Sequence, residues 1–590
     1  MKIEKREERS MKVNSNTCSD KADIVLLHGR IYTEDPEMPW AQALAIKGKR
    51  LVYVGSDEGA KEWIDDGTSV IDFTGKMVIP GLLDGHTHPA TVSKTFWFVR
   101  GPLTEDREEL MKNLREYAEK YPKEEKPYFY YESYFDMMFG KEGPNRRELD
   151  EIISDRPARI QEFGDHACWY NTVALDMLRD ENGVPHNASS FGSAEFIRDE
   201  DGDYTGWCME STVDGDLGIF EHLGWQPESV MNDEMTQPLL DYFRQYGVMG
   251  MMDGYTEGEE NLRYIYELDR EGRLGMFYEG TSILGDVTEL DQAIGTLRQW
   301  QEKYTTEHIR CNIVKFFIDG TNENGDCLST EPFHNDPEGA NCGSANATTE
   351  EMRDVLVRLN REGIDFHVHI ACDGSFRLMC DAVEAAREIC GNDWKIKVTF
   401  AHCELIHPDE VPRVKELGIY IDSSPHWDGG YFGEGAIPFL GKERWETMYD
   451  YTGIIEEGGK VGFSSDVFSY AEASRANPMI GMQVAMTRVD PWIPLDPGRY
   501  PGSVRPPEKA KLSLQQLVHG YTAVNAERMR LDDKLGSLKA GKLANSVVFG
   551  EAIVEHARTS PENFGEVEPE GTWFEGEERH IRSTLKRTRE

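Results

Sequence analysis

The middle of the chain alternates strand-like and helix-like segments, and this alternation restricts the possible folds more than any other feature. Short apolar runs such as "NIVKFFIDG", "DFHVHIACD" and "KVTFAHCE" are separated by amphipathic stretches such as "TEEMRDVLVRLNREG". A strand followed by a helix, repeated several times, is typical of a parallel α/β architecture. An open doubly wound sheet also fits. Functional-looking residues gather at the carboxyl ends of the strands, so we predict a (β/α)8 TIM-like barrel.

The two ends of the chain follow a different pattern. Between residues 23 and 80, apolar residues alternate with polar ones, and Gly, Lys and Asp turns separate the runs. This period of two indicates antiparallel strands, and a similar pattern returns at 530–560. We therefore predict one small β-sandwich domain built from both ends, with the barrel occupying 81–529. Residues 1–22 are predicted to form a flexible arm, and residues 561–590 a polar tail.

Residues from about 101 to 230 do not fit the alternation. They are rich in Tyr, Phe, Trp, Gly and acidic residues, and "EKYPKEEKPYFYYESYFDMMFG" is the most aromatic part. We interpret this stretch as a segment inserted at the barrel mouth.

Charge and composition exclude several classes of partner. The formal net charge of −43 would repel a phosphate backbone, so we expect no nucleic-acid partner. A solubilising acidic surface explains that charge most simply, and steering of a cationic substrate is the alternative. No window approaches the ~20 apolar residues of a membrane span, and the N-terminus has no apolar signal segment. Ten cysteines without CxxC pairs indicate reduced thiols. We expect a cytoplasmic protein that acts on a small molecule. For its oligomeric state, a homodimer is the default expectation.

Six side chains that suit metal binding come at or near the ends of successive predicted strands. Alternate residues of a strand face the same side, so the two histidines of "DGHTHP" point into the barrel together. Two neutral imidazoles in a barrel interior need hydrogen-bond partners or a metal. Chance placement of polar core residues is the alternative, and it becomes hard to maintain for the whole ordered set. In chain order the set is His86, His88, Lys315, His369, His402 and Asp466.

The chemistry of a hydrolytic metal site requires this set of side chains. Zinc binds imidazole nitrogens and carboxylate oxygens, and a catalytic site leaves a position open for water. Two ions can share one hydroxide and lower its pKa toward neutrality. A carboxylate that touches this hydroxide can act as general base, and Asp466 is the candidate. Lys315 lies within an apolar run, where an ammonium is costly to bury unless it is neutralised or paired.

The ordered motifs resemble a known family. The series "VIPGLLDGHTHP", "VKFFIDG", "HIACDG", "AHCELIHPDEVPRVKELG" and "GFSSD" is similar to the metal-dependent amidohydrolase superfamily. More narrowly, it resembles the YtcJ-like group that includes the N-substituted formamide deformylases. The similarity runs from about Asp23 to Gly550, most of the chain. Any single motif is weakly specific, whereas the complete ordered set is strongly specific.

The resemblance implies a role for each of the six side chains. By it, a more buried divalent ion is held by His86, His88 and Asp466, and a more exposed one by His369 and His402. Lys315 is then carboxylated by CO2, and this anionic carbamate bridges both ions, most simply zinc. The alternative is a single ion held by His86, His88, His369 and Asp466, with Lys315 only ion-paired.

The resemblance also places residues near the substrate. "GDHACWYNTVAL" and "DYTGWCMES" resemble two family elements, and His166 in the first could hydrogen-bond the carbonyl or the developing oxyanion, as could His402. A structural role in the inserted segment is the alternative for His166. The loop "DGTNENGDCLSTEPFHND" departs from the family's "DGSLGSRTAAL", so a relative's substrate cannot be transferred. The implied substrate-binding residues are Asp165, Glu210, Asp319, Asp373 and His426.

We therefore expect a hydrolase of a non-peptide carbon–nitrogen bond, in an N-substituted amide or formamide, that uses metal-activated hydroxide. A mononuclear heterocycle deaminase on the same scaffold is the first alternative, and metal stoichiometry with an ammonia assay would distinguish it. A non-catalytic binding relative is the second alternative. The complete ligand set argues against it, because such a relative would be free to lose one of these side chains.

Overall fold

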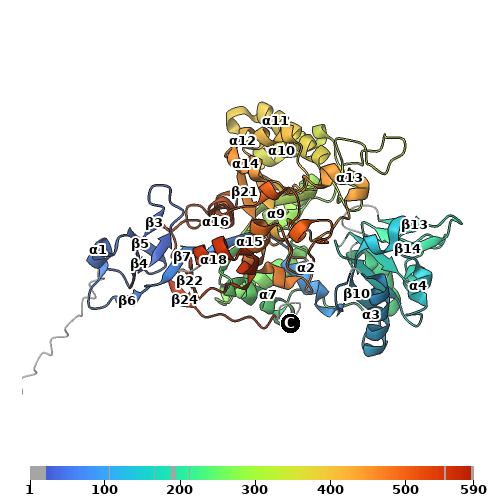
Figure 1. The fold of residues 1–590 in the computed structure, drawn as a ribbon, viewed down its shortest axis with the longest axis horizontal. Coiled ribbons are helices and arrows are strands. Elements are labelled where there is room, and N and C mark those ends of the chain that lie inside the picture. Colours follow the sequence, from blue (N-terminus) through green and yellow to red (C-terminus); the bar gives the residue numbers. More distant parts are fainter. Residues whose placement is uncertain are drawn as a thin grey trace, which may run out of the picture.

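An eight-stranded parallel barrel forms the centre of a computed structural model of the protein (Figure 1). The structure describes residues 21–104, 106–164, 166–187, 194–211, 213–550 and 553–585. The barrel strands are β8 (Leu82–Thr87), β15 (Val248–Asp253), β16 (Phe277–Ile283), β17 (Ile309–Phe317), β18 (Asp365–Ile370), β19 (Val398–His402), β20 (Tyr420–Ser423) and β21 (Lys460–Phe463). Neighbours in this order pair in parallel.

The last strand returns to the first and closes the barrel. β21 lies against β8. Just beyond it, Asp466 N–H donates to the carbonyl of His86 at 2.8 Å, and Ser465 N–H donates to Asp84 Oδ1 at 3.1 Å. An open doubly wound sheet would leave these two edges apart. The predicted (β/α)8 barrel is confirmed.

Helices cover the outside of the barrel (Figure 1). They include α7 (Asp233–Gln245), α8 (Gly258–Arg270), α9 (Leu290–Tyr304), α10 (Thr349–Glu362), α11 (Asp373–Cys390), α12 (Val411–Leu417), α14 (Thr452–Glu456), α15 (Pro478–Thr487), α16 (Leu514–His519) and α17 (Asn525–Arg528). Helix α10 shows how the sequence sets such boundaries. The Thr348 side chain accepts from Glu351 N–H while Glu351 caps Thr348 in return, and Gly363 ends the helix with φ 69°.

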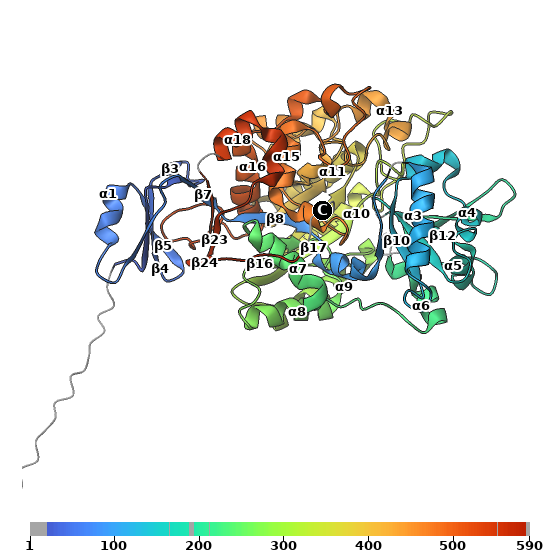
Figure 2. The ribbon, with the colours of Figure 1, turned by 60° about the horizontal axis from the view of Figure 1, so that its bottom comes forward.

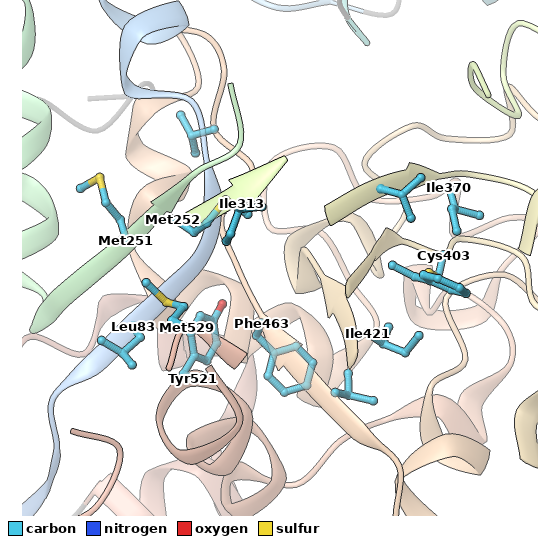
Figure 3. Close-up of a cluster of buried hydrophobic side chains, with 14 of the residues drawn as sticks. Leu83, Met251, Met252, Ile313, Ile370, Cys403, Ile421, Phe463, Tyr521 and Met529 are labelled. Atoms are coloured by element: carbon cyan, nitrogen blue, oxygen red, sulfur yellow. The ribbon is translucent and has the colours of Figure 1, made fainter. Parts of the chain in front are cut away.

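Apolar side chains from the strands and from the helices after β21 form the main core (Figure 3). Leu83, Ile421 and Phe463 come from three different strands, and Tyr521 and Met529 come from the chain around α17. All five are at most 3% exposed. Burying one such side chain contributes about 1.5–3 kcal/mol, so this core holds the strand ends in the positions that the site requires.

A small β-sandwich lies at one end of the molecule, away from the barrel mouth (Figure 2). One sheet has the order β5-β4-β1-β6 and the other β24-β23-β22-β7-β2-β3. Residues from both chain ends, including Leu26, Val78 and Val548, share one apolar cluster between them. The strands are β1 (Ile24–Leu27), β2 (Arg30–Tyr32), β3 (Trp40–Ala41), β4 (Ala43–Lys47), β5 (Arg50–Gly55), β6 (Ser69–Asp72), β7 (Lys76–Pro80), β22 (Ser546–Gly550), β23 (Gly571–Phe574) and β24 (Glu577–Arg579).

The chain beyond residue 560 differs from the polar tail predicted for 561–590. β23 and β24 form a hairpin that extends the sandwich through antiparallel pairing of β23 with β22. Trp573 and Phe574 are buried by it. The polar composition of the segment gave no sign of this hairpin, because a short hairpin at the edge of a sheet needs few apolar residues. The arm predicted for 1–22 lies outside the described residues except for its last two.

The inserted segment forms a separate unit on the opposite side of the barrel from the sandwich (Figures 1 and 2). Its sheet has the order β13-β14-β12-β11-β10-β9. Ser469 beside the barrel mouth donates to Glu132 of this unit at 2.8 Å, and the rings of Phe163 and Tyr431 lie 4.5 Å apart. The elements are β9 (Val99–Arg100), α3 (Arg107–Lys120), β10 (Phe129–Tyr134), α4 (Arg146–Asp150), β11 (Ala158–Glu162), β12 (Ala167–Tyr170), α5 (Thr172–Met177), β13 (Glu195–Arg198), β14 (Tyr204–Met209) and α6 (Leu217–Leu223).

Among the described residues, no helix combines the length and the apolar content that crossing a bilayer requires.

His308 links the sandwich to the barrel, and its ion pairs predict that the stability of the folded protein depends on pH. His308 Nδ1 lies 2.6 Å from Asp269 Oδ1 of α8, and its Nε2 lies 3.1 Å from Glu575 Oε1 of the β23–β24 turn. Burial opposes the imidazolium, but the two carboxylates outweigh it and raise the pKa of His308. The stabilisation is present below the unfolded pKa of about 6.5 and is lost as pH rises through the higher folded value.

His308→Gln should therefore lower the free energy of unfolding by about 2 kcal/mol at pH 6 and by less at pH 9. Chemical denaturation at the two pH values measures this. An equal loss at both would mean that the imidazolium charge contributes nothing to the interface.

Candidate active site

The six predicted metal-binding side chains line one pocket at the carboxyl ends of the barrel strands. Two of them sit on strained backbone, because His402 has φ 69° and Asp466 has φ 44°. Such conformations cost about 1–3 kcal/mol each and persist where the surrounding structure holds them. Tyr451 helps to hold His402, since its hydroxyl donates to the His402 carbonyl at 2.8 Å. The side chains are those of His86, His88, Lys315, His369, His402 and Asp466.

Four of these side chains bring their donor atoms together. His88 Nε2 is 3.1 Å from His86 Nε2 and 3.0 Å from Asp466 Oδ1. His402 Nδ1 is 3.3 Å from the other oxygen of Asp466, and His86 Nε2 is 3.6 Å from Asp466 Oδ1. Ligands held tetrahedrally at zinc bond lengths near 2.1 Å lie about 3.4 Å apart. Donor atoms of His86, His402 and Asp466 lie within 4.8 Å of one another, so this donor set could hold a divalent metal.

Buried polar groups behind His86 orient its ring. His86 Nδ1 is 2.9 Å from His367 Nε2 and 3.6 Å from Asp422 Oδ2. Arg528 in turn donates to Asp422 Oδ1 at 2.7 Å. Burial lowers the pKa of His86 well below its usual value, so the ring is neutral, as a metal ligand must be. Partners of this kind fix which nitrogen faces a metal.

The sequence reasoning did not give His367, Asp422 or Arg528 a role. His367 was visible as the first histidine of "HVH", and Asp422 as a carboxylate at the end of the strand-like run "LGIYIDSS". Arg528 lies on α17, far along the chain, and no local pattern connected it to the site.

Lys315 is fully buried in β17. Its Nζ has no hydrogen-bond partner among the described residues. Burial lowers the pKa of Lys315 to about 7, and Asp466 and Asp422 oppose this shift. A neutral amine is nucleophilic, and its reaction with CO2 would give an anion next to the donor cluster. The orphaned amine therefore fits a metal-bridging carbamate.

His369 reaches the same pocket but faces a different group. Its ring centroid is 4.5 Å from that of His402. Its Nε2 donates to the carbonyl of Gly320 at 3.0 Å and is 3.8 Å from Asp319 Oδ1. The structure thus brings His369 beside the donor cluster, with one nitrogen occupied by backbone.

The inserted unit contributes His166 to the pocket, and Glu210, which is not part of the pocket lining, pairs with it from behind. His166 Nδ1 lies 3.1 Å and 3.2 Å from the two oxygens of Glu210. Burial opposes the imidazolium, but Glu210 raises the pKa of His166 to about 10. The ring of His166 lies 6.1 Å from that of His369. An imidazolium at this position can stabilise negative charge on a reacting carbonyl oxygen.

Three other predicted substrate-binding residues, Asp319, Asp373 and His426, do not line the pocket. Asp319 accepts from the backbone N–H groups of Ala371 and Cys372 at 3.0 and 3.3 Å, which holds the end of β18. Asp373 accepts from Arg444 Nη2 at 2.9 Å and is not part of the pocket lining. His426 is buried, with its ring 5.8 Å from that of Tyr431, and it does not line the pocket either. Asp165 lies outside the described residues.

Loop residues complete the pocket wall, and the sequence reasoning had not identified them. Trp427 stacks on His402 with the ring centroids 5.3 Å apart and the planes at 22°. Glu257 accepts from Thr91 Oγ1 at 2.6 Å and pairs with Lys94. Other loop residues in the wall include Tyr255, Glu323, Glu404, Phe432 and Phe468.

Comparison with known proteins places the chain among hydrolases. The model of the "Amidohydrolase family" matches residues 69–580. The chain is 26% identical over 447 residues to the exoenzymes regulatory protein AepA of Pectobacterium carotovorum subsp. carotovorum, covering 74% of this chain and 92% of that protein. It is 21% identical over 560 residues to the N-substituted formamide deformylase of Arthrobacter pascens, covering 91% and 94%.

A solved structure has the same fold. An uncharacterized metal-dependent hydrolase from Pyrococcus furiosus superposes with a TM-score of 0.62 at 23% identity, covering 89% of this chain and 98% of that one.

Proposed function

Because this chain belongs to the amidohydrolase family, we propose that it is a metal-dependent hydrolase of N-substituted amides or formamides. One observation carries the proposal. Imidazole and carboxylate donors from three distant strand ends converge at 3.0–3.6 Å, next to a buried lysine that has no hydrogen-bond partner among the described residues. A barrel core that served only stability would not gather these groups around an unsatisfied Lys315 amine.

The donor set would hold two divalent ions. One ion would be bound by His86, His88 and Asp466, and the other by His369 and His402, with the Lys315 carbamate between them. When bound, such a pair lowers the pKa of a shared water toward neutrality and polarises the amide carbonyl. Zinc suits these imidazole and carboxylate ligands.

The chain's own residues would then move the proton and stabilise charge. The Asp466 carboxylate would accept a proton from the attacking water and pass it to the leaving nitrogen, so that an amide and water give a carboxylic acid and an amine. His166, held as an imidazolium by Glu210, would donate to the developing oxyanion. Burial lowers the pKa of His402 well below its usual value, so this neutral ring would serve as a metal ligand beside Asp466 and not as a second cationic donor.

Two findings support this choice of bond. The full-length relative from Arthrobacter pascens is named an N-substituted formamide deformylase. The pocket wall also contains the aromatic rings of Phe317, Trp427 and Phe432, which suit the organic substituent of a small amide.

Elemental analysis of the purified protein, followed by a screen of amides and formamides for amine release, tests the proposal. We expect about two equivalents of divalent metal per chain and amine release that a chelator abolishes. Release of ammonia from a heterocycle with one bound metal would favour a deaminase instead. Metal-free protein that binds amides without turnover would contradict an enzymatic role.

A further inference from the structure

Two carboxylates lie on one wall of the active-site pocket, and the proposed reaction does not use them. Glu323 belongs to the loop between β17 and α10. Glu404 follows β19 by two residues. Both line the pocket together with Lys315 and His402. They therefore belong to the β17–β19 side of the mouth, whereas His88 and Asp466 belong to the β8–β21 side.

Neither carboxylate has an ion pair within 4.0 Å among the described residues. Glu404 is 5% exposed, and one hydrogen bond satisfies it, from Asn322 Nδ2 to Oε2 at 2.8 Å. Arg505 is the buried cation that influences both electrostatically. Its Nη2 instead contacts the Trp445 carbonyl at 3.4 Å, and its guanidinium packs over the Trp445 ring.

The Glu404 carboxylate points to a ligand, because a buried carboxylate without a cation is costly to retain. Glu257 in the same pocket illustrates the contrast, since Lys94 neutralises it. Next to the unpaired carboxylates, the rings of Trp427 and Phe432 lie 5.3 Å apart at 68° and form an aromatic wall. Carboxylates beside aromatic faces suit an organic ammonium group, which gains both charge pairing and cation–π attraction. A net charge of −43 favours encounter with such a cation as well.

We propose, on the basis of the proposed hydrolase function, that the preferred substrates are amides whose far end carries an ammonium group. Monoacylated diamines are the simplest members of this class. The amide carbonyl would lie at the His86–Asp466 cluster, and the ammonium group would lie between Glu323 and Glu404. The loop between β17 and α10, which carries Glu323, thus determines substrate specificity.

Matched substrate pairs test the proposal with metal-loaded full-length protein. Each pair has the same acyl group and chain length and ends either in an ammonium group or in a methyl group. We expect kcat/KM to favour the ammonium member by about tenfold or more, as charged hydrogen bonds predict. In Glu323→Gln and Glu404→Gln this ratio should fall toward one. Glu416→Gln, which removes the same charge from an exposed site on α12, should keep the wild-type ratio.

A binding measurement separates this proposal from the proposed function. Calorimetry with metal-loaded Asp466→Asn compares the two members of a pair without any turnover. Tighter binding of the ammonium member, lost when Glu404→Gln is added, supports the specificity even if no amide is hydrolysed. Equal binding of both members and equal kcat/KM would overturn the specificity while leaving the hydrolase intact.

Discussion

Asp466→Asn is expected to abolish amide turnover, with kcat falling by about a thousandfold or more. Asp466 alone contacts both sides of the donor cluster, since one oxygen lies 3.0 Å from His88 Nε2 and the other 3.3 Å from His402 Nδ1. Asparagine has nearly the same shape and can still offer one oxygen to a metal. It cannot accept a proton, however, so the loss would be in the chemical step.

Three measurements on Asp466→Asn distinguish a loss in the chemical step from a loss of metal or of the folded structure. Single-turnover kinetics should show the loss of rate, elemental analysis should show most of the metal retained, and thermal unfolding should show a folded protein. Asp354→Asn, which removes a carboxylate from the exposed face of α10, should behave like wild type in all three. Full activity in Asp466→Asn would remove its assignment as the general base.

Lys315→Ala is expected to lower the metal content to about half of the wild-type value or less, and kcat by about a hundredfold. The buried amine sits next to the donor cluster without a hydrogen-bond partner among the described residues. If it carries the bridging carbamate, its removal takes away the anion that both ions share. Short carboxylic acids such as acetate or propionate should then enter the vacated space and restore part of both metal content and activity.

A second variant separates the lost amine from the cavity that alanine leaves. Lys315→Met retains most of the side-chain volume, so it should lose metal like Lys315→Ala but should not be rescued by carboxylic acids. An unchanged metal count in both variants would favour a single ion held by His86, His88, His369 and Asp466.

Local pattern was sufficient to predict the alternating strands and helices, and the polar residues at the strand ends favoured the barrel over an open sheet. Because alternate residues of a strand share one face, the spacing of His86 and His88 indicated that both rings enter the barrel together. Because parallel strands end at one face of a barrel, Lys315 and His402 could be placed in the same pocket although 87 positions separate them in the numbering. The helix over Thr349–Glu362 was also predictable, since its capping residues Thr348 and Glu351 are close in sequence.

Residues in loops and at long range were not predictable in this way. Asp373 keeps an acidic position beside a site histidine, yet its carboxylate contacts Arg444 outside the pocket lining. Conversely, Glu323 and Trp427 line the pocket although neither lies on a strand with a readable period. Likewise, the hairpin of β23 and β24 depends on pairing with β22 and was hidden by a polar composition.

The sequence by itself predicted a parallel α/β unit with its covering helices, because periodicities of two and 3.6 residues act over a few neighbouring positions. The position of six polar side chains at the strand ends then favoured a barrel over an open sheet. Only the tertiary structure decided which nitrogen of His86 faces its partners and that the inserted unit holds His166 at the pocket. It also decided that, within the part of the chain that the structure describes, Glu323 and Glu404 have no ion-pair partner. Such facts depend on contacts between segments hundreds of residues apart, and these contacts form only when the whole core packs.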